Sequence, residues 1–350
     1  MSGRRTVSGN RRVFGVPPAL AAAALAAALT AGCSAPGGAS PTAAEAGPVR
    51  GEPAPSAASP YWVDPDSDAA RQVRAWDRQG REDDAKALRR IADRPVALWP
   101  AWDAPGPEIA AAAKAAAETK KSVLLVAYNI PHRDCGLYSA GGAKDADAYR
   151  SWLGEFAEAI GDAPATVILE PDALPHIADG CTPPEHHAER YQLLSEAVDT
   201  LKAQPRTKVY LDAGNPDWIK EPSKIAEPLR QAGIDRADGF SLNVSNFQSN
   251  TSVKEYGALL SDTVGGGAHY VIDTSRNGGG PLTGDRAEAW CNPPGRALGT
   301  PPTTDTRDDR LDAYLWIKRP GESDGTCRGG PEAGTWWPEY ALGLAERATS

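Results

Sequence analysis

Six apolar, β-rich stretches in this chain each run into a polar or acidic residue. The stretches lie at 123–128, 166–170, 208–212, 239–244, 269–273 and 313–318, and they lead in turn to Asp134, Asp172, Asp212, Asn243, Asp273 and Asp324. Helical patterns fill most of the gaps, among them 108–120, 148–160, 185–202 and 223–231. Strands that alternate with helices predict a parallel α/β sheet or barrel.

A further apolar stretch at 96–99 brings the expected number of strands to seven. Short, continuously apolar strands are typical of sheets that are buried on both faces. No Gly-rich dinucleotide-binding turn follows the first strand, which favours a barrel over an open sheet. Active sites of such folds gather where the strands end. A ring of carboxylates at that rim, with tryptophans nearby, indicates acid–base chemistry on a sugar.

The charge balance limits the class of partner. Charged residues are 24% of the chain, and the formal net charge is −9. The first 32 residues contain four arginines and no acid, so the remainder is more acidic still. An acidic body argues against a nucleic-acid partner, whereas a neutral polysaccharide would not be repelled. No cofactor is expected, and we expect a monomer.

The first 32 residues resemble an export signal, with a basic start, an apolar run and small residues before a cysteine. Leu29-Thr-Ala-Gly-Cys33 resembles a bacterial lipoprotein cleavage box, in which Cys33 becomes the lipidated first residue. The alternative is a plain secretory signal with a chance cysteine. Arg11-Arg12 weakly resembles a twin-arginine signal. The apolar run is too short for a permanent membrane span. We therefore expect an exported protein, held at the cell surface by lipid or secreted.

The rest of the chain divides into two parts. Residues 33–60 are rich in Pro, Ala, Gly and Ser, which predicts a disordered tether. Residues 61–350 form the expected folded domain, with no internal repeat. Apart from Cys33, this part of the chain contains four cysteines, and an even number in an exported chain implies two disulfides with three possible connectivities.

Three acids are the main catalytic candidates. Glycoside hydrolysis needs one protonated carboxyl group and one that accepts a proton. Asp172 follows a proline after an apolar strand, where desolvation would keep it protonated. Asp134 precedes a cysteine, so a disulfide would fix its loop, and Asp324 lies in a Gly-flanked loop. The alternative for each acid is a helix cap or an Arg partner.

Tryptophans could supply the sugar-binding surface. Trp99, Trp218 and Trp290 lie at or beyond strand ends, and indole rings stack on pyranose rings. Core packing is the alternative, and it is the interpretation for Trp76, Trp152 and Trp316. No HExxH, GxSxG or P-loop motif is present, and adjacent histidines on a helix do not share a face, so no metal site is expected.

The motifs together resemble glycoside hydrolase family 6, the endoglucanases and cellobiohydrolases. The segments that carry the resemblance follow in the family's order: Tyr128-Asn-Ile-Pro-His-Arg-Asp-Cys-Gly136, Leu169-Glu-Pro-Asp172, Leu211-Asp-Ala-Gly214 with Trp218, Asn243-Val-Ser-Asn246, Val271-Ile-Asp-Thr-Ser-Arg-Asn-Gly278, Trp290-Cys291, Gly295-Arg296 and Ile317-Lys-Arg-Pro-Gly-Glu-Ser-Asp324. The resemblance covers residues 61–350 and implies a distorted seven-stranded parallel β/α barrel, a variant of the TIM barrel.

This resemblance implies an inverting hydrolase of β-1,4-glucan. Asp172 would be the general acid, Asp134 would raise its pKa, and Asp324 would be the candidate base. Tyr128 would crowd the sugar at subsite −1. The implied sugar-binding residues are Trp99, Asp212, Trp218, Asn243, Asn246, Trp290, Lys318 and Glu322. The implied disulfides are Cys135–Cys181 and Cys291–Cys327.

The chain departs from the family pattern at three positions: Asn215 replaces a usual histidine, Phe247 an aromatic hydroxyl and Ala140 a serine. The short body favours an open groove and endo-cleavage over a cellobiohydrolase tunnel. A non-catalytic glucan-binding lipoprotein is the alternative from another class. The substrate is either nutrient cellulose or the cell's own exopolysaccharide.

Overall fold

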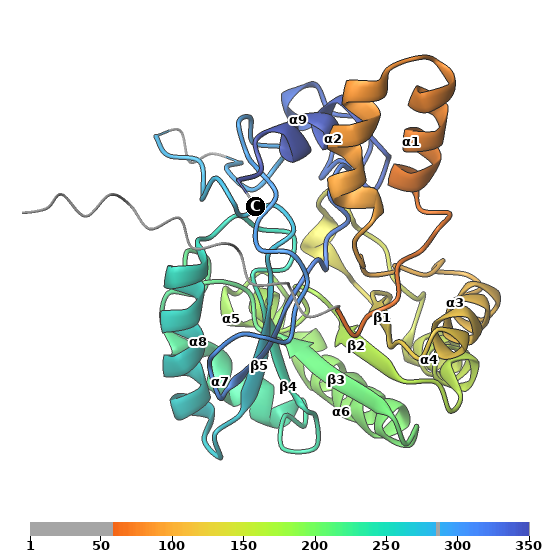
Figure 1. Ribbon diagram of the computed structural model, residues 1–350. Coiled ribbons are helices and arrows are strands. Elements are labelled where there is room, and N and C mark those ends of the chain that lie inside the picture. Colours follow the sequence, from red (N-terminus) through yellow and green to blue (C-terminus); the bar gives the residue numbers. More distant parts are fainter. Residues whose placement is uncertain (1–58, 285–287, 350) are drawn as a thin grey trace, which may run out of the picture. The chain divides into compact units, whose positions relative to one another are not determined.

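The computed structural model describes residues 59–284 and 288–349 (Figure 1). The predicted export signal, Cys33 and nearly all of the predicted tether lie outside this part of the chain. Within it, one parallel sheet has the strand order β1-β2-β3-β4-β5-β6. The strands are β1 Val123–Ala127, β2 Ala165–Leu169, β3 Thr207–Asp212, β4 Gly239–Leu242, β5 His269–Asp273 and β6 Leu311–Leu315. The protein is therefore a parallel α/β half-barrel.

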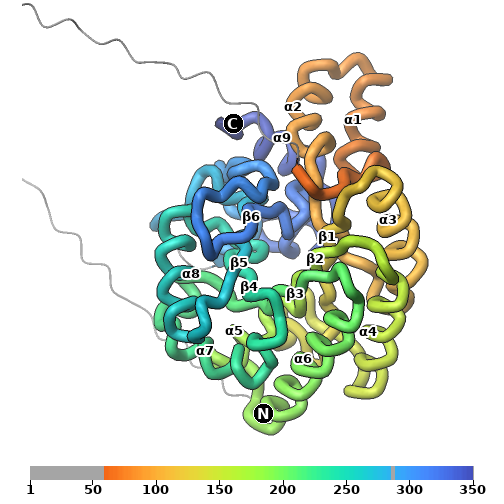
Figure 2. Tube along the Cα trace, turned by 60° about the horizontal axis from the view of Figure 1, so that its bottom comes forward, coloured from red at the N-terminus to blue at the C-terminus, as the bar shows by residue number. Residues whose placement is uncertain are grey.

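Helices fill the gaps between the strands. The helices that precede β1 or connect consecutive strands up to β5 are α3 Gly106–Glu118, α4 Ala146–Ile160, α5 Pro175–Ala178, α6 His187–Lys202, α7 Pro222–Gln231 and α8 Asn250–Val264. Figure 2 shows the strands as a curved row with these helices around its outside. The remaining helices are α1 Asp68–Arg78, α2 Glu82–Ala92, α9 Pro338–Glu346 and the 3-10 turns η1 Asp134–Gly136, η2 Pro184–His186 and η3 Cys327–Gly329. The four predicted helices match α3, α4, α6 and α7 closely.

The continuous apolar runs have a direct structural cause. Leu125 of β1 packs into a large core between the sheet and the outer helices. Its neighbours Leu124 and Val126 point into a second core on the inner face, with Tyr210 and Leu315. Because successive strand residues alternate between two buried faces, each position must be apolar. A third core joins α1, α2 and α9 around the predicted core residues Trp76 and Trp316.

The predicted strand at 96–99 is not a strand in the structure. Leu98 forms only an isolated parallel bridge with Leu125. The Leu98 N–H donates to Leu124 O at 2.9 Å, and the Ala97 N–H donates to Trp316 O at 2.9 Å. These bonds place the segment between β1 and the chain after β6, but they are too few to form a regular ladder. Six strands are observed, and the seventh is not confirmed.

Candidate active site

The acid predicted to protonate the leaving group lies directly after β2. Asp172 has a left-handed backbone with φ 70°, as does Glu170 with φ 49°. Such conformations are rare for residues with a side chain and concentrate at functional sites. The Asp172 N–H donates to Asp212 Oδ2 at 2.9 Å. This bond fixes the backbone from which the Asp172 carboxyl projects.

Burial sets the protonation of Asp172. Loss of hydration, together with the carboxylates of Asp134 and Asp179, raises the pKa of Asp172 to about 6 against the opposing charge of His176. Burial, followed by the charge of Asp172, also raises the pKa of Asp212 to about 7. A carboxyl with such a pKa holds its proton under mildly acidic conditions, as a general acid requires.

Asp134 is brought beside Asp172 by the loop after β1. Its Oδ2 accepts a hydrogen bond from the Ser139 N–H at 2.6 Å. Its Oδ1 lies 3.8 Å from His176 Nε2. One ligand-type atom from each of Asp134, Asp172 and His176 lies within 4.8 Å of the others. The structure thus joins two predicted site residues with a histidine that the sequence motifs did not single out.

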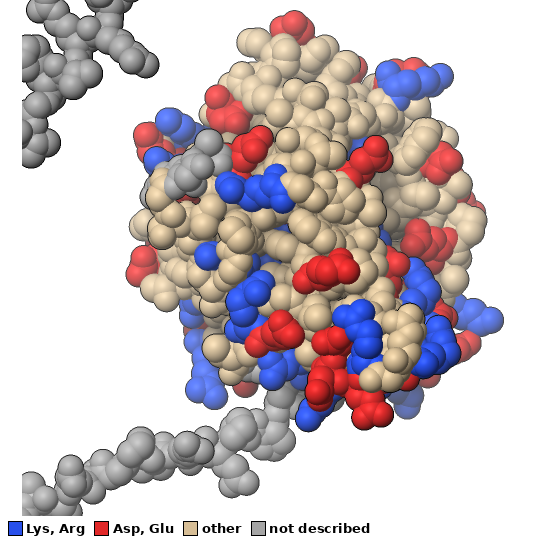
Figure 3. All heavy atoms as spheres, turned by 90° about the horizontal axis from the view of Figure 1, so that it is seen from above, with Lys and Arg blue, Asp and Glu red and all other residues tan. Residues whose placement is uncertain are grey.

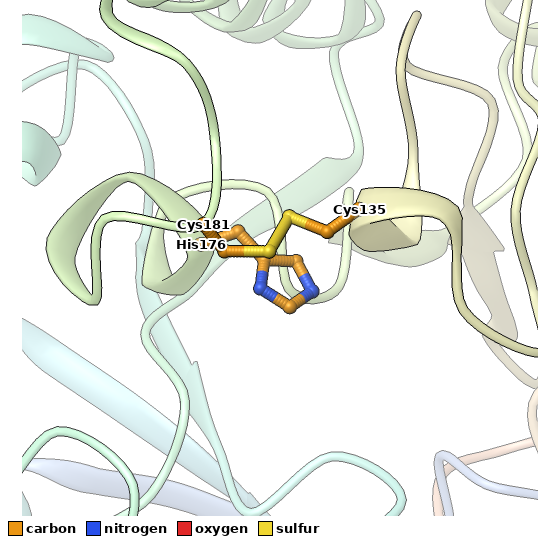
Figure 4. Close-up of side chains that lie close together, drawn as sticks. All are labelled: Cys135, His176 and Cys181. Atoms are coloured by element: carbon orange, nitrogen blue, oxygen red, sulfur yellow. A yellow bond between two sulfur atoms is a disulfide. The ribbon is translucent and has the colours of Figure 1, made fainter.

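Both implied disulfides form. They are Cys135–Cys181 and Cys291–Cys327, with sequence separations of 46 and 36 residues. The first ties the loop of Asp134 to the end of α5, and Figure 4 shows His176 beside it. Because both sulfurs are bonded to each other, the grouping of Cys135, Cys181 and His176 is no metal site.

We expect each disulfide to stabilise the fold by about 3–4 kcal/mol in the chain-entropy model, because each closes a loop of several tens of residues. Replacing Cys291 and Cys327 together with serine should lower the free energy of unfolding by this amount, measured by urea unfolding without reductant. Peptide mapping of the unreduced wild type should recover 135 linked to 181. Free thiols, or 135 linked to 291, would contradict the pairing.

The third acid, Asp324, is held by a buried arginine. Its Oδ2 accepts from Arg276 Nη1 at 2.8 Å and from the Asn292 N–H at 3.0 Å. The two side chains are 0% and 6% exposed. Lys318 Nζ lies 3.9 Å from Oδ1, to which no described residue donates a hydrogen bond. One oxygen is therefore fixed, and the other remains able to accept a proton.

Lys318 and Glu322 belong to the same charged group. Lys318 Nζ lies 3.8 Å from Glu322 Oε2, and Arg319 Nε lies 2.7 Å from Glu322 Oε1. Burial lowers the pKa of Lys318 and raises that of Glu322, and the opposite charges oppose both shifts. A pocket beside α1 also reaches Arg319 and Glu322, but neither Asp134 nor Asp172 lines it.

Two acids at strand ends, Glu170 and Asp273, bind backbone N–H groups of neighbouring segments and do not project into the candidate site. Glu170 accepts hydrogen bonds from the Asn129 and Ile130 N–H groups at 2.9–3.0 Å. Asp273 accepts from the N–H groups of Ser245, Ser275, Ile317 and Lys318. Both carboxyls are buried, and each fastens neighbouring strand ends together. They are structural supports for the site.

Three predicted sugar-binding residues are also bonded within the protein. Asp212 is 1% exposed and accepts from Ser241 Oγ at 3.1 Å. Asn243 is fully buried and donates to Asp273 O at 2.9 Å. Asn246 is half-buried, and its Oδ1 accepts from the Phe247 N–H at 2.8 Å. Of the three, Asn246 alone retains substantial exposure.

The rim aromatics are held at defined angles. Trp99 Nε1 donates to Ile317 O at 2.8 Å, and its ring meets Tyr128 edge-on at 5.4 Å. The Arg133 guanidinium lies 4.3 Å from the centroid of the Tyr128 ring. Trp218 Nε1 donates to Asp179 Oδ2 at 2.8 Å. Trp152 is buried and packs against Phe156, as predicted for a core residue.

A contact that the motifs did not indicate joins the two sides of the site. Tyr138, from the loop of Asp134, is 41% exposed, and its ring centroid lies 5.9 Å from that of Trp290, which is 38% exposed. A Cβ at Gly325, whose φ is 152°, would come within 2.5 Å of the Tyr138 ring. The two loops therefore touch at one aromatic pair.

Comparison with known proteins assigns the family. The model of the family described as "Glycosyl hydrolases family 6" matches residues 56–348. The chain belongs to glycosyl hydrolase family 6. It is 43% identical over 303 residues to endoglucanase A of Thermobispora bispora, covering 85% of this chain and 64% of that protein. The chain thus spans just under two thirds of that relative. With endoglucanase 1 of Streptomyces halstedii it shares 43% identity over 291 residues, covering 80% of this chain and 87% of the relative.

A solved family 6 structure has the same fold. It is the endoglucanase Cel6 from Mycobacterium tuberculosis in complex with methyl-cellobiosyl-4-deoxy-4-thio-β-D-cellobioside. The TM-score is 0.77 at 44% identity, covering 84% of this chain and 99% of that chain. A parallel α/β half-barrel with two disulfides is thus established for this family 6 member.

The departures from the family 6 pattern fit locally. Asn215 is 3% exposed, and its Oδ1 accepts from the Asp217 and Trp218 N–H groups at 3.1 and 3.2 Å. It therefore shapes the turn that carries Trp218. Phe247 is 1% exposed, and the Arg276 guanidinium lies 4.4 Å from its ring centroid. Ala140 is the last residue of a turn, which its N–H closes by donating a hydrogen bond to Leu137 O.

Proposed function

We propose that this protein hydrolyses internal β-1,4 linkages of a β-glucan with inversion at the anomeric carbon. The observation that carries the proposal is Asp172, a half-buried carboxyl whose pKa is raised to about 6, beside Asp134. Family membership and the endoglucanase names of the relatives support the same substrate class. The acid pair supplies the protonated group that departure of a sugar alkoxide requires.

In this mechanism Asp172 protonates the glycosidic oxygen. Asp134 keeps the proton on Asp172 by its negative charge and stabilises the positive charge that develops on the sugar ring. Asp324 accepts a proton from the attacking water, directly or through a second water, at Oδ1, the oxygen that lies 3.9 Å from Lys318 Nζ. Tyr128 lies between Trp99 and Arg133, where its ring would crowd the sugar at subsite −1.

The surface suits a neutral polymer. Figure 3 shows acidic and basic side chains interspersed on the displayed face, with broad areas that carry neither. We propose that Trp99, Trp218 and Trp290 stack on glucosyl rings, and that Lys318, Glu322 and Asn246 bind hydroxyl groups. Asp212 and Asn243 would contribute indirectly, because their hydrogen bonds hold the backbone that surrounds the sugar.

Endo action is the primary proposal, and a cellobiohydrolase is the second candidate. The contact between Tyr138 and Trp290 favours the second, because loops that meet over a cleft restrict entry to chain ends. The viscosity of a soluble β-1,4-glucan should fall much faster than reducing ends appear. Parallel progress of the two signals would indicate exo action, and absence of both would favour a non-catalytic glucan-binding protein.

We expect the first product to have the α configuration, because an inverting enzyme delivers water to the face opposite the acid. Proton NMR of the anomeric signals during early hydrolysis of a soluble β-glucan measures this directly. Retention would produce β anomers first, and that outcome would remove Asp324 from the role of base.

We further propose that the mature protein begins at lipidated Cys33, with residues 33–60 as its leash. Two or more acyl chains would be needed for stable anchoring. The leash would span roughly 30 Å, from 5–6 Å times the square root of its length. Among the described residues, no helix is both long and apolar enough to cross a bilayer. The chain would act as a monomer on nutrient glucan or on the cell's own exopolysaccharide.

Cys33→Ala should release the protein from membranes without changing its specific activity, because the catalytic domain expected from the sequence begins at residue 61. Fractionation of cells that produce each form, followed by activity assays, measures both quantities. A variant that stays with the membrane fraction would exclude the lipid anchor.

We also propose that segment 96–99 takes the place of a seventh strand. Its support is the pair of 2.9 Å bonds from Ala97 N to Trp316 O and from Leu98 N to Leu124 O, which span the gap between β1 and the chain after β6. This arrangement would put Trp99 at the same rim as the acids. Slow amide exchange at 97 and 98, comparable to that of β1, would test it.

A further inference from the structure

His176 is a buried histidine without a hydrogen-bond partner in the described part of the chain. The residue is 6% exposed, and neither ring nitrogen makes a hydrogen bond. Its Nε2 lies 3.8 Å from Asp134 Oδ1, and its Nδ1 lies 3.7 Å from Asp179 Oδ2. An isolated neutral imidazole would be costly there, since burying unpaired polar atoms carries a penalty. The surroundings must compensate this cost.

Charge supplies the compensation. Three carboxylates face the ring from three segments: Asp134 from η1, Asp172 from the loop after β2, and Asp179 from the end of α5. Burial works against a charged imidazole, but these carboxylates raise the pKa of His176 to about 9. A cation among three anions therefore fits the geometry, whereas a neutral ring does not.

His176 also connects the acids to a rim tryptophan. Asp179 Oδ2 accepts from Trp218 Nε1 at 2.8 Å, while Asp179 Oδ1 accepts from the Cys181 N–H at 2.8 Å. The Trp218 ring meets the imidazole edge-on, with centroids 4.9 Å apart. The Cys135–Cys181 disulfide lies next to the ring (Figure 4). The contacts thus run from Asp134 through His176 and Asp179 to Trp218.

Resting on the glycosidase function proposed above, we propose that His176 is a positioning residue for the acid pair: as a buried cation it holds Asp134 beside Asp172 and sets the highest pH at which Asp172 still delivers a proton. It acts through the two aspartates and touches no reacting atom in this role. Without the cation, three carboxylates would repel one another across a poorly hydrated space.

The charges around Asp172 determine whether each one raises or lowers its pKa. The cation favours the ionised form of Asp172 and so lowers its pKa, while Asp134 and Asp179 raise it. Since the general acid must be protonated, activity is lost as pH rises through that pKa. Asp212 and Tyr128 also face Asp172, so the observed limb is an apparent value for the group.

His176→Asn should therefore move the high-pH limb of kcat upward by about one unit, because an opposite charge at this distance is removed. We also expect kcat to fall by about tenfold to a hundredfold, because Asp134 loses its partner.

Asp179→Asn should move the high-pH limb of kcat the opposite way, by a smaller amount, because it removes an anion that is partly exposed. The amide has a single oxygen and can keep only one of the two hydrogen bonds, from Trp218 or from Cys181, so the fold of this variant is verified by thermal unfolding. A purely structural role predicts no such pair of opposite shifts.

His269→Asn is the matched control. His269 lies at the start of β5, away from the carboxyl ends of the strands, and its Nδ1 lies 2.8 Å from Asp312 Oδ1. Its variant should leave the limb unchanged. All proteins are assayed as full chains on a soluble β-1,4-glucan, and thermal unfolding verifies folding.

A second readout does not depend on activity. Proton NMR of the imidazole resonances, assigned by their loss in His176→Asn, should show one histidine that stays protonated above pH 8. If the wild type is inactive on every glucan, the proposed function fails, and this titration still tests the cation. If the wild type is active but both variants keep the wild-type limb, or if His176 titrates near its ordinary pKa, the role assigned to His176 is wrong.

Discussion

Asp172→Asn is expected to lower kcat on unactivated β-glucan by roughly 10²- to 10⁴-fold, the usual contribution of a positioned general acid. An amide cannot deliver a proton to the glycosidic oxygen. KM should change little, since the two side chains have nearly the same shape. In the wild type, activity should fall as pH rises above about 6, because burial raises the pKa of Asp172 to that value and the acid is then ionised. Initial rates from pH 4 to 9 measure both quantities.

The leaving group provides the control. An aryl cellobioside with an acidic phenol needs little protonation, so Asp172→Asn should lose far less rate on it than on the polymer. The loss of activity of the wild type at high pH should also be absent from the pH profile of Asp172→Asn, because the titrating acid has been removed. An equal loss on both substrates would show that Asp172 has a structural role or positions the sugar, and the general acid would have to be sought elsewhere.

The sheet was predictable because its strands are buried on both faces. A run such as 123–127 must be apolar at every position when alternate residues enter two cores, and that pattern is visible in the sequence. Segment 96–99 is equally apolar but makes only an isolated bridge. Its pairing depends on how β1 and β6 approach each other, which no local pattern records. The α1–α2 hairpin was likewise not predicted, and it is stabilised by packing with α9.

The acids of the site were partly predictable. Motif order identified Asp134 and Asp172, and the structure brings them together. Sequence cannot tell which strand-end carboxyl faces the cleft and which binds the next strand's backbone. Asp273 and Glu170 do the latter, since they accept from backbone N–H groups in the segments that follow β6 and β1. The histidine between the acids escaped notice because the loop that carries Asp134 reaches it only in the folded chain, although Asp172 and Asp179 are near it in sequence.

Arg276→Leu is expected to lower the free energy of unfolding by about 3–5 kcal/mol, the usual cost of leaving one member of a buried ion pair alone. Arg276 and Asp324 are 48 residues apart in sequence, and both are almost fully buried. The substitution leaves the Asp324 carboxylate with Lys318 at 3.9 Å in place of a hydrogen-bonded guanidinium, removes the contact with Phe247 and frees Ser245 O. Activity should fall with stability, because Asp324 loses its fixed orientation. Urea unfolding without reductant measures the first effect.

Two comparisons separate this pair from an ordinary surface contact. Arg236→Leu breaks an equally short pair with Asp199 at 2.7 Å, but these side chains are 42% and 60% exposed, so its cost should stay below about 1 kcal/mol. The double variant Arg276→Leu with Asp324→Leu should be less destabilised than Arg276→Leu alone, because no buried charge remains unpaired. If Arg276→Leu costs no more than Arg236→Leu, water must reach Asp324 freely. The carboxylate would then be an exposed base, and the buried ion pair would contribute nothing to holding it.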